Sequence, residues 1–328
     1  MSAQKKSKAR RLTVGFCKFL GGLLIVALVG EFYLKSLGGS LHDCPLDDAE
    51  LFFVPTPGSW TSEEDPDVKE NVGPDGMRLS RPDGTVSKPH NVLVSGCSYT
   101  FGVGVADKET YVWRLNELCP EANFDNCGVS GYGPYRSLIR LRRYLPRKRY
   151  DLVIYSMLDN HLDRDSMPHL VFTNDGDSGE LITLPYMSID GSGNCVEHPL
   201  QQLNWPLTDR SYLMNFLRNS CVLVKARSVQ EPSVKEKQAI FAYIMNSMAT
   251  EARAANAKFV LAVLNRNPVP APMFSPDVNI INVAFQNGED LSDEYRVRHQ
   301  HNTHPNGIVH DYWASKIAEQ LREQHYLD

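Results

Sequence analysis

An apolar strand that runs directly into a tight turn is the feature that most constrains this chain. Residues 92–95 read Val-Leu-Val-Ser, and Gly96 and Gly102 enclose a turn that carries Ser98. A short, almost continuously apolar strand fits a parallel sheet covered on both faces. Ligands collect beyond the carboxyl ends of such strands, so Ser98 is predicted to lie where nucleophiles lie. The alternative is a purely structural turn, because small polar residues are common in turns.

The chain beyond Pro89 alternates short apolar segments with amphipathic ones, which predicts one three-layer α/β/α domain. A chain of 328 residues, of which 42% are hydrophobic, can bury one substantial core. We expect a sheet of five parallel strands. The predicted strands are 91–95, 123–126, 152–155, 259–263 and 279–283, and the predicted helices are 110–118, 135–144, 234–255 and 310–322.

A histidine near the C-terminus supplies a candidate base for this serine. Pro305 and Asn306 follow His304 and predict a turn just before a helix, so the ring would lie on a rigid loop. Imidazole suits proton transfer from a serine, because it titrates close to neutral pH. The alternative is a polar loop whose histidines only cap a helix.

The same region offers a metal site as rival chemistry, with four histidines at His299, His301, His304 and His310. No cysteine or acidic motif completes a recognised ligand spacing around them. A histidine-rich loop that accompanies a glycine-lined serine is better explained by acyl transfer. We therefore expect neither a metal nor another cofactor.

Four short segments occur in an order that carries a family resemblance: 96–98, 126–133, 151–160 and 301–305. They resemble the sequence blocks of the SGNH/GDSL family of serine esterases and acyltransferases, over about residues 88–323. The resemblance implies a flavodoxin-like parallel five-stranded sheet. It also implies Ser98 as nucleophile, His304 as general base and the Gly131 N–H as one donor to the oxyanion.

Three positions depart from the family pattern. Cys97 stands before the nucleophile where the family has an aspartate, which leaves the serine unchanged. Asp159-Asn160 stands where Asn-Asp is usual; an ionised Asp159 cannot donate a hydrogen bond, so Asn160 would take that role. His301 stands where the family has the orienting aspartate, and a neutral imidazole stabilises a protonated His304 much less than a carboxylate does.

The identity of the third triad member therefore stays open. Asp293, Glu294 and Asp311 are carboxylates near His304 in the sequence, and a backbone carbonyl or water could also orient the ring. A catalytically impaired domain that binds glycan or scaffolds an envelope assembly is the alternative to an enzyme.

The N-terminus predicts a membrane anchor. Five basic residues precede an apolar run from Leu12 to Leu34: Lys5, Lys6, Lys8, Arg10 and Arg11. That length can span a hydrocarbon core, and the basic flank predicts a cytoplasmic tail at 1–11, with the chain beyond about residue 36 outside the inner membrane. We expect a signal anchor at 12–35, an irregular stalk or wrap at 36–88, and a catalytic domain at 89–328 with an insertion at about 172–227. A cleaved signal peptide is the competing interpretation.

Cysteine and charge patterns add two further expectations. An even set of cysteines follows the apolar run, and we expect Cys119 and Cys127 to form a disulfide in an oxidising compartment. A net charge of −5 argues against a nucleic-acid partner. The basic run at 136–149 is expected to be the solvated side of a helix, with Arg140, Arg142 and Arg143 facing water.

These expectations combine into one function. The chain is predicted to be an exported, membrane-anchored serine esterase that removes acyl groups, acetyl foremost, from cell-envelope glycan or related small esters. An O-acyltransferase acting on exported polysaccharide is the alternative enzyme. Protein partners, acyl length and acceptor are not predicted by the sequence.

Overall fold

The computed structural model describes residues 3–36, 48–62, 64–82, 88–172, 181–208, 210–288, 291–297 and 304–327. The chain forms two compact units. The larger unit comprises residues 47–169, 184–200 and 231–328, and the smaller unit comprises residues 1–46, 170–183 and 201–230.

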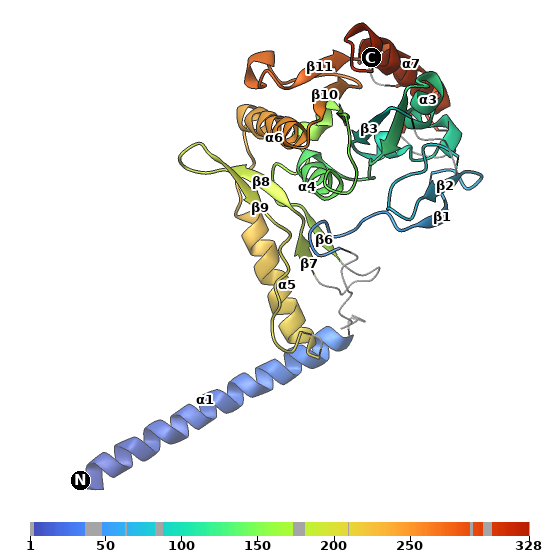
Figure 1. Cartoon of the computed structure of the whole chain (residues 1–328). Helices are drawn as coiled ribbons and strands as arrows, with labels where there is room; N and C mark the ends of the chain where they lie inside the picture. The colour runs from blue at the N-terminus through green and yellow to red at the C-terminus, as the bar shows by residue number, and fades with distance from the viewer. Residues whose placement is uncertain are drawn as a thin grey trace. The chain divides into compact units, whose positions relative to one another are not determined.

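A five-stranded parallel sheet forms the centre of the larger unit, in the order β11-β10-β5-β3-β4 (Figure 1). Its strands are β3 (His90–Ser95), β4 (Ala122–Asn126), β5 (Leu152–Met157), β10 (Lys258–Val263) and β11 (Asn279–Asn282). Numbered along the chain, this is the 2-1-3-4-5 order of flavodoxin-like sheets. The predicted five-stranded parallel sheet is confirmed.

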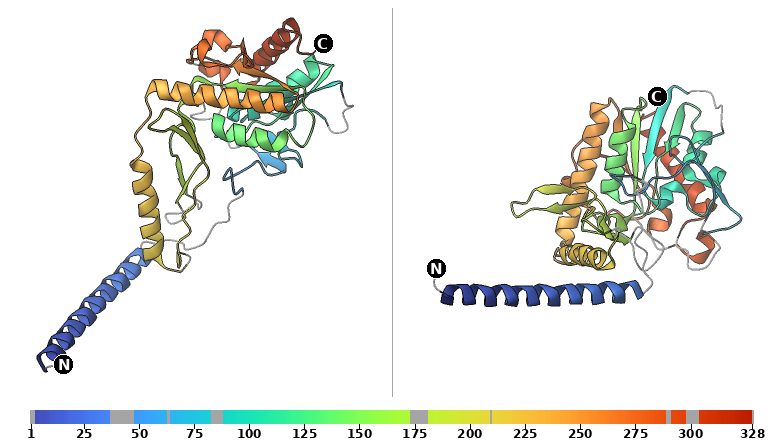
Figure 2. Two further views of the ribbon diagram at one scale, coloured as in Figure 1. Left: turned by 60° about the vertical axis from the view of Figure 1, so that its left-hand side comes forward. Right: turned by 90° about the horizontal axis from the view of Figure 1, so that it is seen from below.

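Helices cover both faces of this sheet. α3 (Tyr111–Leu118) and α7 (Gly307–Glu323) pack together on one face, while α4 (Pro134–Tyr144) and α6 (Val234–Ala254) pack together on the other (Figure 2). The predicted three-layer architecture is confirmed. α7 begins three residues earlier than the sequence suggested, because the Asn306 side chain accepts a hydrogen bond from the Ile308 N–H at 3.1 Å and so caps the helix.

The segment before the sheet is more ordered than the irregular stalk or wrap that we expected. It contains an antiparallel hairpin of β1 (Gly58–Thr61) and β2 (Lys69–Val72). Arg78, which is 1% exposed, then donates hydrogen bonds to Asp107 Oδ1 at 2.8 Å and to the Val105 carbonyl at 2.9 Å. The described part of this segment is therefore fixed against the loop that follows α2 (Ser98–Phe101).

The predicted insertion at 172–227 is divided between the two units. β8 (Tyr186–Ile189) and β9 (Cys195–His198) form a hairpin in the larger unit. The smaller unit contains α1 (Ala3–Ser36), α5 (Tyr212–Arg227) and a hairpin of β6 (Leu170–Phe172) and β7 (Leu181–Thr183). Single 3-10 turns complete the described chain: η1 (Asp107–Glu109), η2 (Asp159–Leu162), η3 (Ala271–Met273), η4 (Phe285–Gly288) and η5 (Asp293–Tyr295).

Within α1, residues Lys18–Ser36 form one helix that is long and apolar enough to cross a membrane. Its large apolar side chains are exposed, including Phe19, Leu24 and Val29. A helix with apolar residues exposed all round is unfavourable in water and fits the predicted anchor.

The expected exposure of Arg140 is wrong. Arg140 is 2% exposed, and it donates to the Gly76 carbonyl at 2.6 Å and contacts Cys127 Sγ at 3.1 Å. Its guanidinium group is buried because its hydrogen-bond partners, Gly76 and Cys127, belong to other segments of the chain that pack against α4. Arg136 of the same run is also buried, at 5% exposed, whereas Arg142 and Arg143 are half-buried and form ion pairs with carboxylates of neighbouring segments.

The expected disulfide is also wrong, since Cys119 and Cys127 are both free thiols. All five residues of strand β4 lie between them. An extended strand rises about 3.3 Å per residue, so its two ends are too far apart for a disulfide.

Candidate active site

Ser98 is the first residue of the four-residue helix α2, which follows β3 directly. The helix ends at Gly102, whose φ of +84° suits glycine and whose N–H donates to the Ser98 carbonyl at 2.8 Å. Ser98 is 5% exposed. In the described chain, neither its N–H nor its Oγ makes a hydrogen bond, so both are available to a substrate.

The turn after β4 lies directly against α2. A Cβ on Gly128 would lie 2.5 Å from the Phe101 nitrogen, and a Cβ on Gly96 would lie 2.1 Å from Thr100 Oγ1. The Asn126 side chain bridges the two segments, because its Nδ2 donates to the Thr100 carbonyl at 2.8 Å and its Oδ1 accepts from the Gly128 N–H at 3.1 Å. Glycine and asparagine at these positions therefore hold the second sequence block against the helix that carries the serine.

Gly131 lies farther along the same turn, with a φ of +74°. No atom lies within 4 Å of a Cβ added there, so the space beside its backbone is open. The Gly131 carbonyl accepts a hydrogen bond from Arg136, which forms a buried ion pair with Asp165 at 3.2 Å. These contacts hold the Gly131 peptide, and its N–H has no acceptor among the residues described.

A backbone interaction holds His304 just before α7. The Val297 N–H donates to the His304 carbonyl at 3.0 Å. The centroid of the His304 ring lies 5.5 Å from that of Tyr99, the residue after Ser98. The structure therefore brings the predicted base to the helix that carries the predicted nucleophile.

A carboxylate that faces His304 comes from the segment before the sheet. Glu64 Oε1 lies 3.4 Å from His304 Nδ1. A Cβ on Gly104 would lie 3.2 Å from the Glu64 Cβ, which places Glu64 against the loop after α2. The sequence did not point to Glu64, because no periodicity or turn pattern of a Pro- and Gly-rich segment shows where it folds back.

The carboxylates that the sequence did suggest have other partners. Asp311 pairs with Arg114 at 2.8 Å, and Asp293 pairs with Arg296 at 3.6 Å. Glu294 lies in η5, and its backbone carbonyl accepts from the Asn306 side chain at 2.8 Å. His299 and His301 lie outside the described residues.

The His304 ring is uncharged at neutral pH. Burial, with a smaller contribution from the positive charge of Arg164, lowers the pKa of His304 to about 4. An uncharged imidazole can accept a proton, as a general base must. Nδ1 is the ring nitrogen that faces Glu64.

Asp159 and Asn160 have different surroundings at the end of β5. The Asp159 carboxylate accepts from the Asn160 N–H at 2.8 Å and from Asn265 Nδ2 at 2.9 Å, and it lies 3.5 Å from Arg266 Nε. Asn160 is exposed, and its side chain has no hydrogen-bond partner within the part of the chain described. Asp159 therefore shapes the turn, while the Asn160 amide is available as a donor.

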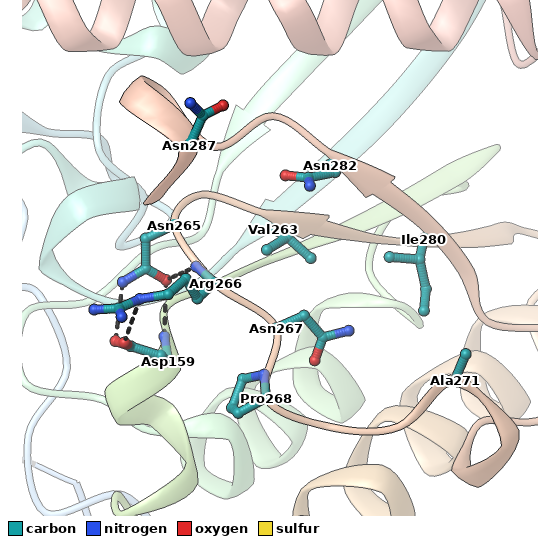
Figure 3. Close-up of a pocket in the computed structure, with 10 residues that line it drawn as sticks. All are labelled: Asp159, Val263, Asn265, Arg266, Asn267, Pro268, Ala271, Ile280, Asn282 and Asn287. Atoms are coloured by element: carbon teal, nitrogen blue, oxygen red, sulfur yellow. Dashed lines mark hydrogen bonds and ion pairs between the residues drawn. The ribbon is translucent and has the colours of Figure 1, made fainter. Parts of the chain in front are cut away.

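Asp159 also lines a pocket of about 700 Å³ at the ends of β10 and β11 (Figure 3). The other polar residues that line it are Asn265, Arg266, Asn267, Asn282 and Asn287, and the apolar ones are Val263, Pro268, Ala271 and Ile280. A signal for this pocket was present in the sequence, where Asn-Arg-Asn follows a buried strand almost at once.

Two asparagines of this pocket have their amide orientation set by the backbone. Asn267 Oδ1 accepts from the Val269 N–H at 3.0 Å, and Asn282 Oδ1 accepts from the Ala284 N–H at 3.1 Å. The Nδ2 group of each is therefore a donor without a partner among the described residues. A ligand that offers oxygen acceptors matches this arrangement.

His310 has a structural role. Its Nδ1 accepts from the Tyr111 N–H at 3.2 Å, and burial lowers the pKa of His310 to about 3. In the described residues, no group of three or more His, Cys, Asp or Glu side chains could hold a metal ion.

Comparison with known proteins gives similar solved structures only. No protein-family model matches the chain, and no curated protein matches it. TesA is 15% identical, with 71% of this chain and 99% of TesA covered and a TM-score of 0.41. A GDSL-like lipase from Bacteroides thetaiotaomicron is 14% identical, with 74% and 93% covered and a TM-score of 0.36.

A catalytic mutant of an acetylxylan esterase from Geobacillus stearothermophilus is 14% identical, with 73% of this chain and 95% of that protein covered and a TM-score of 0.37. The solved structures similar to this chain thus include hydrolases of the GDSL type.

We expect His304 to stay uncharged until the pH falls to about 4. Arg164→Gln should raise this pKa, because a nearby guanidinium disfavours a second positive charge. NMR titration of the imidazole nitrogens measures both values. Arg149→Gln, which removes an exposed charge of the same kind, is the control. A wild-type midpoint near 6.5 would contradict the burial of the ring.

Proposed function

We propose that this chain is an SGNH-type serine esterase in which Ser98 is the nucleophile and His304 is the general base. The observation that carries the proposal is the position of the His304 ring, which contacts Tyr99 beside Ser98 and turns Nδ1 toward Glu64. The first three sequence blocks also extend beyond the carboxyl ends of the neighbouring parallel strands β3, β4 and β5, in the order that the family resemblance implies.

The proposed reaction has two steps. Ser98 Oγ attacks the ester carbonyl carbon as its proton moves to His304 Nε2, and the oxyanion accepts hydrogen bonds from the N–H groups of Ser98 and Gly131 and from the Asn160 amide. His304 returns the proton to the leaving alkoxide. Water then attacks the acyl-serine with His304 again as base, which releases the acid and restores Ser98.

Glu64 takes the place of the missing aspartate in this proposal. A carboxylate beside Nδ1 holds the ring in the productive tautomer and stabilises it when it becomes positively charged. His301, the residue at the family position, is then not needed for that role. This favours an active enzyme over the catalytically impaired scaffold.

The proposed substrate is an acyl ester on a glycan. The asparagine pocket supports this class, because sugar oxygens can accept from the Nδ2 groups of Asn267 and Asn282. Apolar side chains in the same pocket can contact the C–H face of a sugar ring. If a glycan hydroxyl replaces water in the second step, the same residues perform O-acyl transfer.

The proposed location is the outer side of the inner membrane. The span within α1 and the basic residues before it support a single-pass anchor with a cytoplasmic N-terminus. Ester-bearing envelope glycan is found on the other side of such a membrane, where the larger unit would lie.

Replacing the reacting groups tests the esterase proposal. Ser98→Ala and His304→Ala should each lower kcat for p-nitrophenyl acetate by about 10³-fold or more, because each removes a group that acts in the same step. Ser192→Ala, in an exposed turn, should leave kcat unchanged. A wild-type protein that is no faster than Ser98→Ala, and that a fluorophosphonate probe does not label, excludes this mechanism.

Glu64→Gln should lower kcat by about 10²- to 10⁴-fold, with little change in KM or melting temperature, because Glu64 acts through His304 and not on the substrate. Glu64→Asp should restore part of the rate. Asp293→Asn is the matched control, since its side chain is fully exposed. The assignment fails if Asp293→Asn is the slower variant or if Glu64→Gln keeps the full rate.

Asn282→Asp tests the glycan pocket, because it keeps the acceptor for the Ala284 N–H but removes the free Nδ2 donor. We expect KM for O-acetylated glucose, mannose or xylose hexaoses to rise about tenfold, while the kinetics with p-nitrophenyl acetate stay unchanged. Asn279→Asp, at the other end of β11, is the control. If the wild type, Asn282→Asp and Asn279→Asp have equal KM values for the glycan esters, the pocket does not bind the substrate.

A further inference from the structure

The helix α5 has a reversed distribution of polar and apolar side chains. Two of its three buried residues are polar: Asn215 and Arg218 are 9% and 2% exposed, and the apolar Val222 is 4% exposed. Phe216, Leu217 and Val224 are 53%, 41% and 68% exposed. A helix on a water-soluble surface normally shows the opposite pattern, so this exposed apolar face needs an explanation.

A hydrogen bond to β7 and another within α5 hold this orientation of α5. Asn219 Oδ1 accepts from the Leu181 N–H at 3.1 Å, and Asn219 Nδ2 donates to Asn215 Oδ1 at 2.8 Å. The polar residues thus have partners on the buried side of the helix. A rotation that hid the apolar residues would break these bonds and leave buried polar groups unpaired.

The exposed apolar side chains form one stripe along α5. Leu217, Cys221 and Val224 are spaced by four and three residues, which places them on one side of the helix, and Phe216 lies beside them. We refer to these four residues as the α5 stripe. Lys225 and Arg227 follow at the C-terminal end of the same helix.

The start of α5 is bonded to the candidate membrane helix. Glu31 of α1 accepts hydrogen bonds from the Ser211 hydroxyl at 2.7 Å and from the N–H groups of Tyr212 and Leu213 at 2.8 and 2.9 Å. Figure 1 shows the beginning of α5 against the C-terminal part of α1.

The position of Glu31 sets the level at which α5 begins. Glu31 lies five residues before the end of the span at Ser36, which is about 7–8 Å along a helix. A carboxylate so near the hydrocarbon region is costly unless it is hydrogen-bonded, and the first turn of α5 supplies the donors. The first turn of α5 is therefore held at the membrane boundary if α1 spans the bilayer.

We propose that α5 binds the lipid surface, with the α5 stripe inserted at the boundary between headgroups and acyl chains. Lys225 and Arg227 are suited to lipid phosphates beside it. The proposal rests on the proposed anchoring by α1 and is independent of the esterase chemistry. It makes the smaller unit a two-point attachment, with one spanning helix and one interfacial helix.

The test uses the full chain in nanodiscs at one copy per disc, with an environment-sensitive NBD label on Cys221 and with Cys17, Cys44 and Cys195 replaced by serine. We expect blue-shifted emission that shallow nitroxide lipids quench and aqueous iodide does not. The control is the same label on the thiol introduced by Ser192→Cys in a Cys221→Ser background, which iodide should quench. Equal iodide quenching at both sites overturns the proposal.

A second variant pair separates lipid from protein as the occupant. Val224→Glu should abolish lipid quenching at Cys221, whereas Val234→Glu, at an equally exposed valine outside α5, should preserve it. Protection of the label only in discs that hold two copies would assign the stripe to a dimer instead. Extraction of the whole protein by alkaline carbonate would show that α1 does not anchor the chain. Retention of the protein together with iodide quenching at Cys221 would show instead that α1 is inserted while α5 is exposed to water.

Discussion

The close approach of two neighbouring turns is the constraint on which the candidate site depends. β3 and β4 are parallel neighbours, so the chain leaves both strands at the same edge of the sheet. There, the turn after β4 lies in van der Waals contact with α2, which follows β3. Gly96 and Gly128 permit that contact, because a side chain at either position would overlap α2. The result is that α2, which carries Ser98, and the turn that carries Gly131 follow adjacent strands at the same edge of the sheet.

Much of the fold and some candidate residues of the site could be predicted from local sequence. The pattern of apolar and polar residues within each strand of the main sheet, and within each helix that covers it, indicates that element by itself. Short segments of four or five residues predicted the strands, the turn after the first of them led to Ser98, and the turn before the last helix led to His304. Gly131 came from the family resemblance. The sequence did not predict Glu64, whose position depends on how a segment without periodicity folds back on the sheet. Arg140 was misassigned for a related reason, because its buried acceptors belong to distant turns.

Two further failures have different physical causes. The proposed disulfide ignored the length of β4, which keeps Cys119 and Cys127 at opposite ends of an extended strand. The helix α5 was not among the predicted helices, and a helical period would show which of its residues share a face but not which face is buried. For α5, that choice is made by the contacts with β7 and with Glu31.

Burial and the Glu64 carboxylate act on His304 in opposite directions, and their balance suits a general base. Burial is the larger of the two effects on the uncharged ring, so the pKa of His304 is low and the ring is neutral. Glu64 Oε1 lies 3.4 Å from His304 Nδ1, and its electrostatic attraction to a neutral ring is weak. If the ring takes the proton of Ser98, as we propose, it becomes a cation in surroundings of low dielectric constant, where attraction to a nearby carboxylate is strong. In the proposed mechanism, the stabilisation by Glu64 is therefore larger in the transition state than before the reaction, and only such a difference accelerates the chemical step.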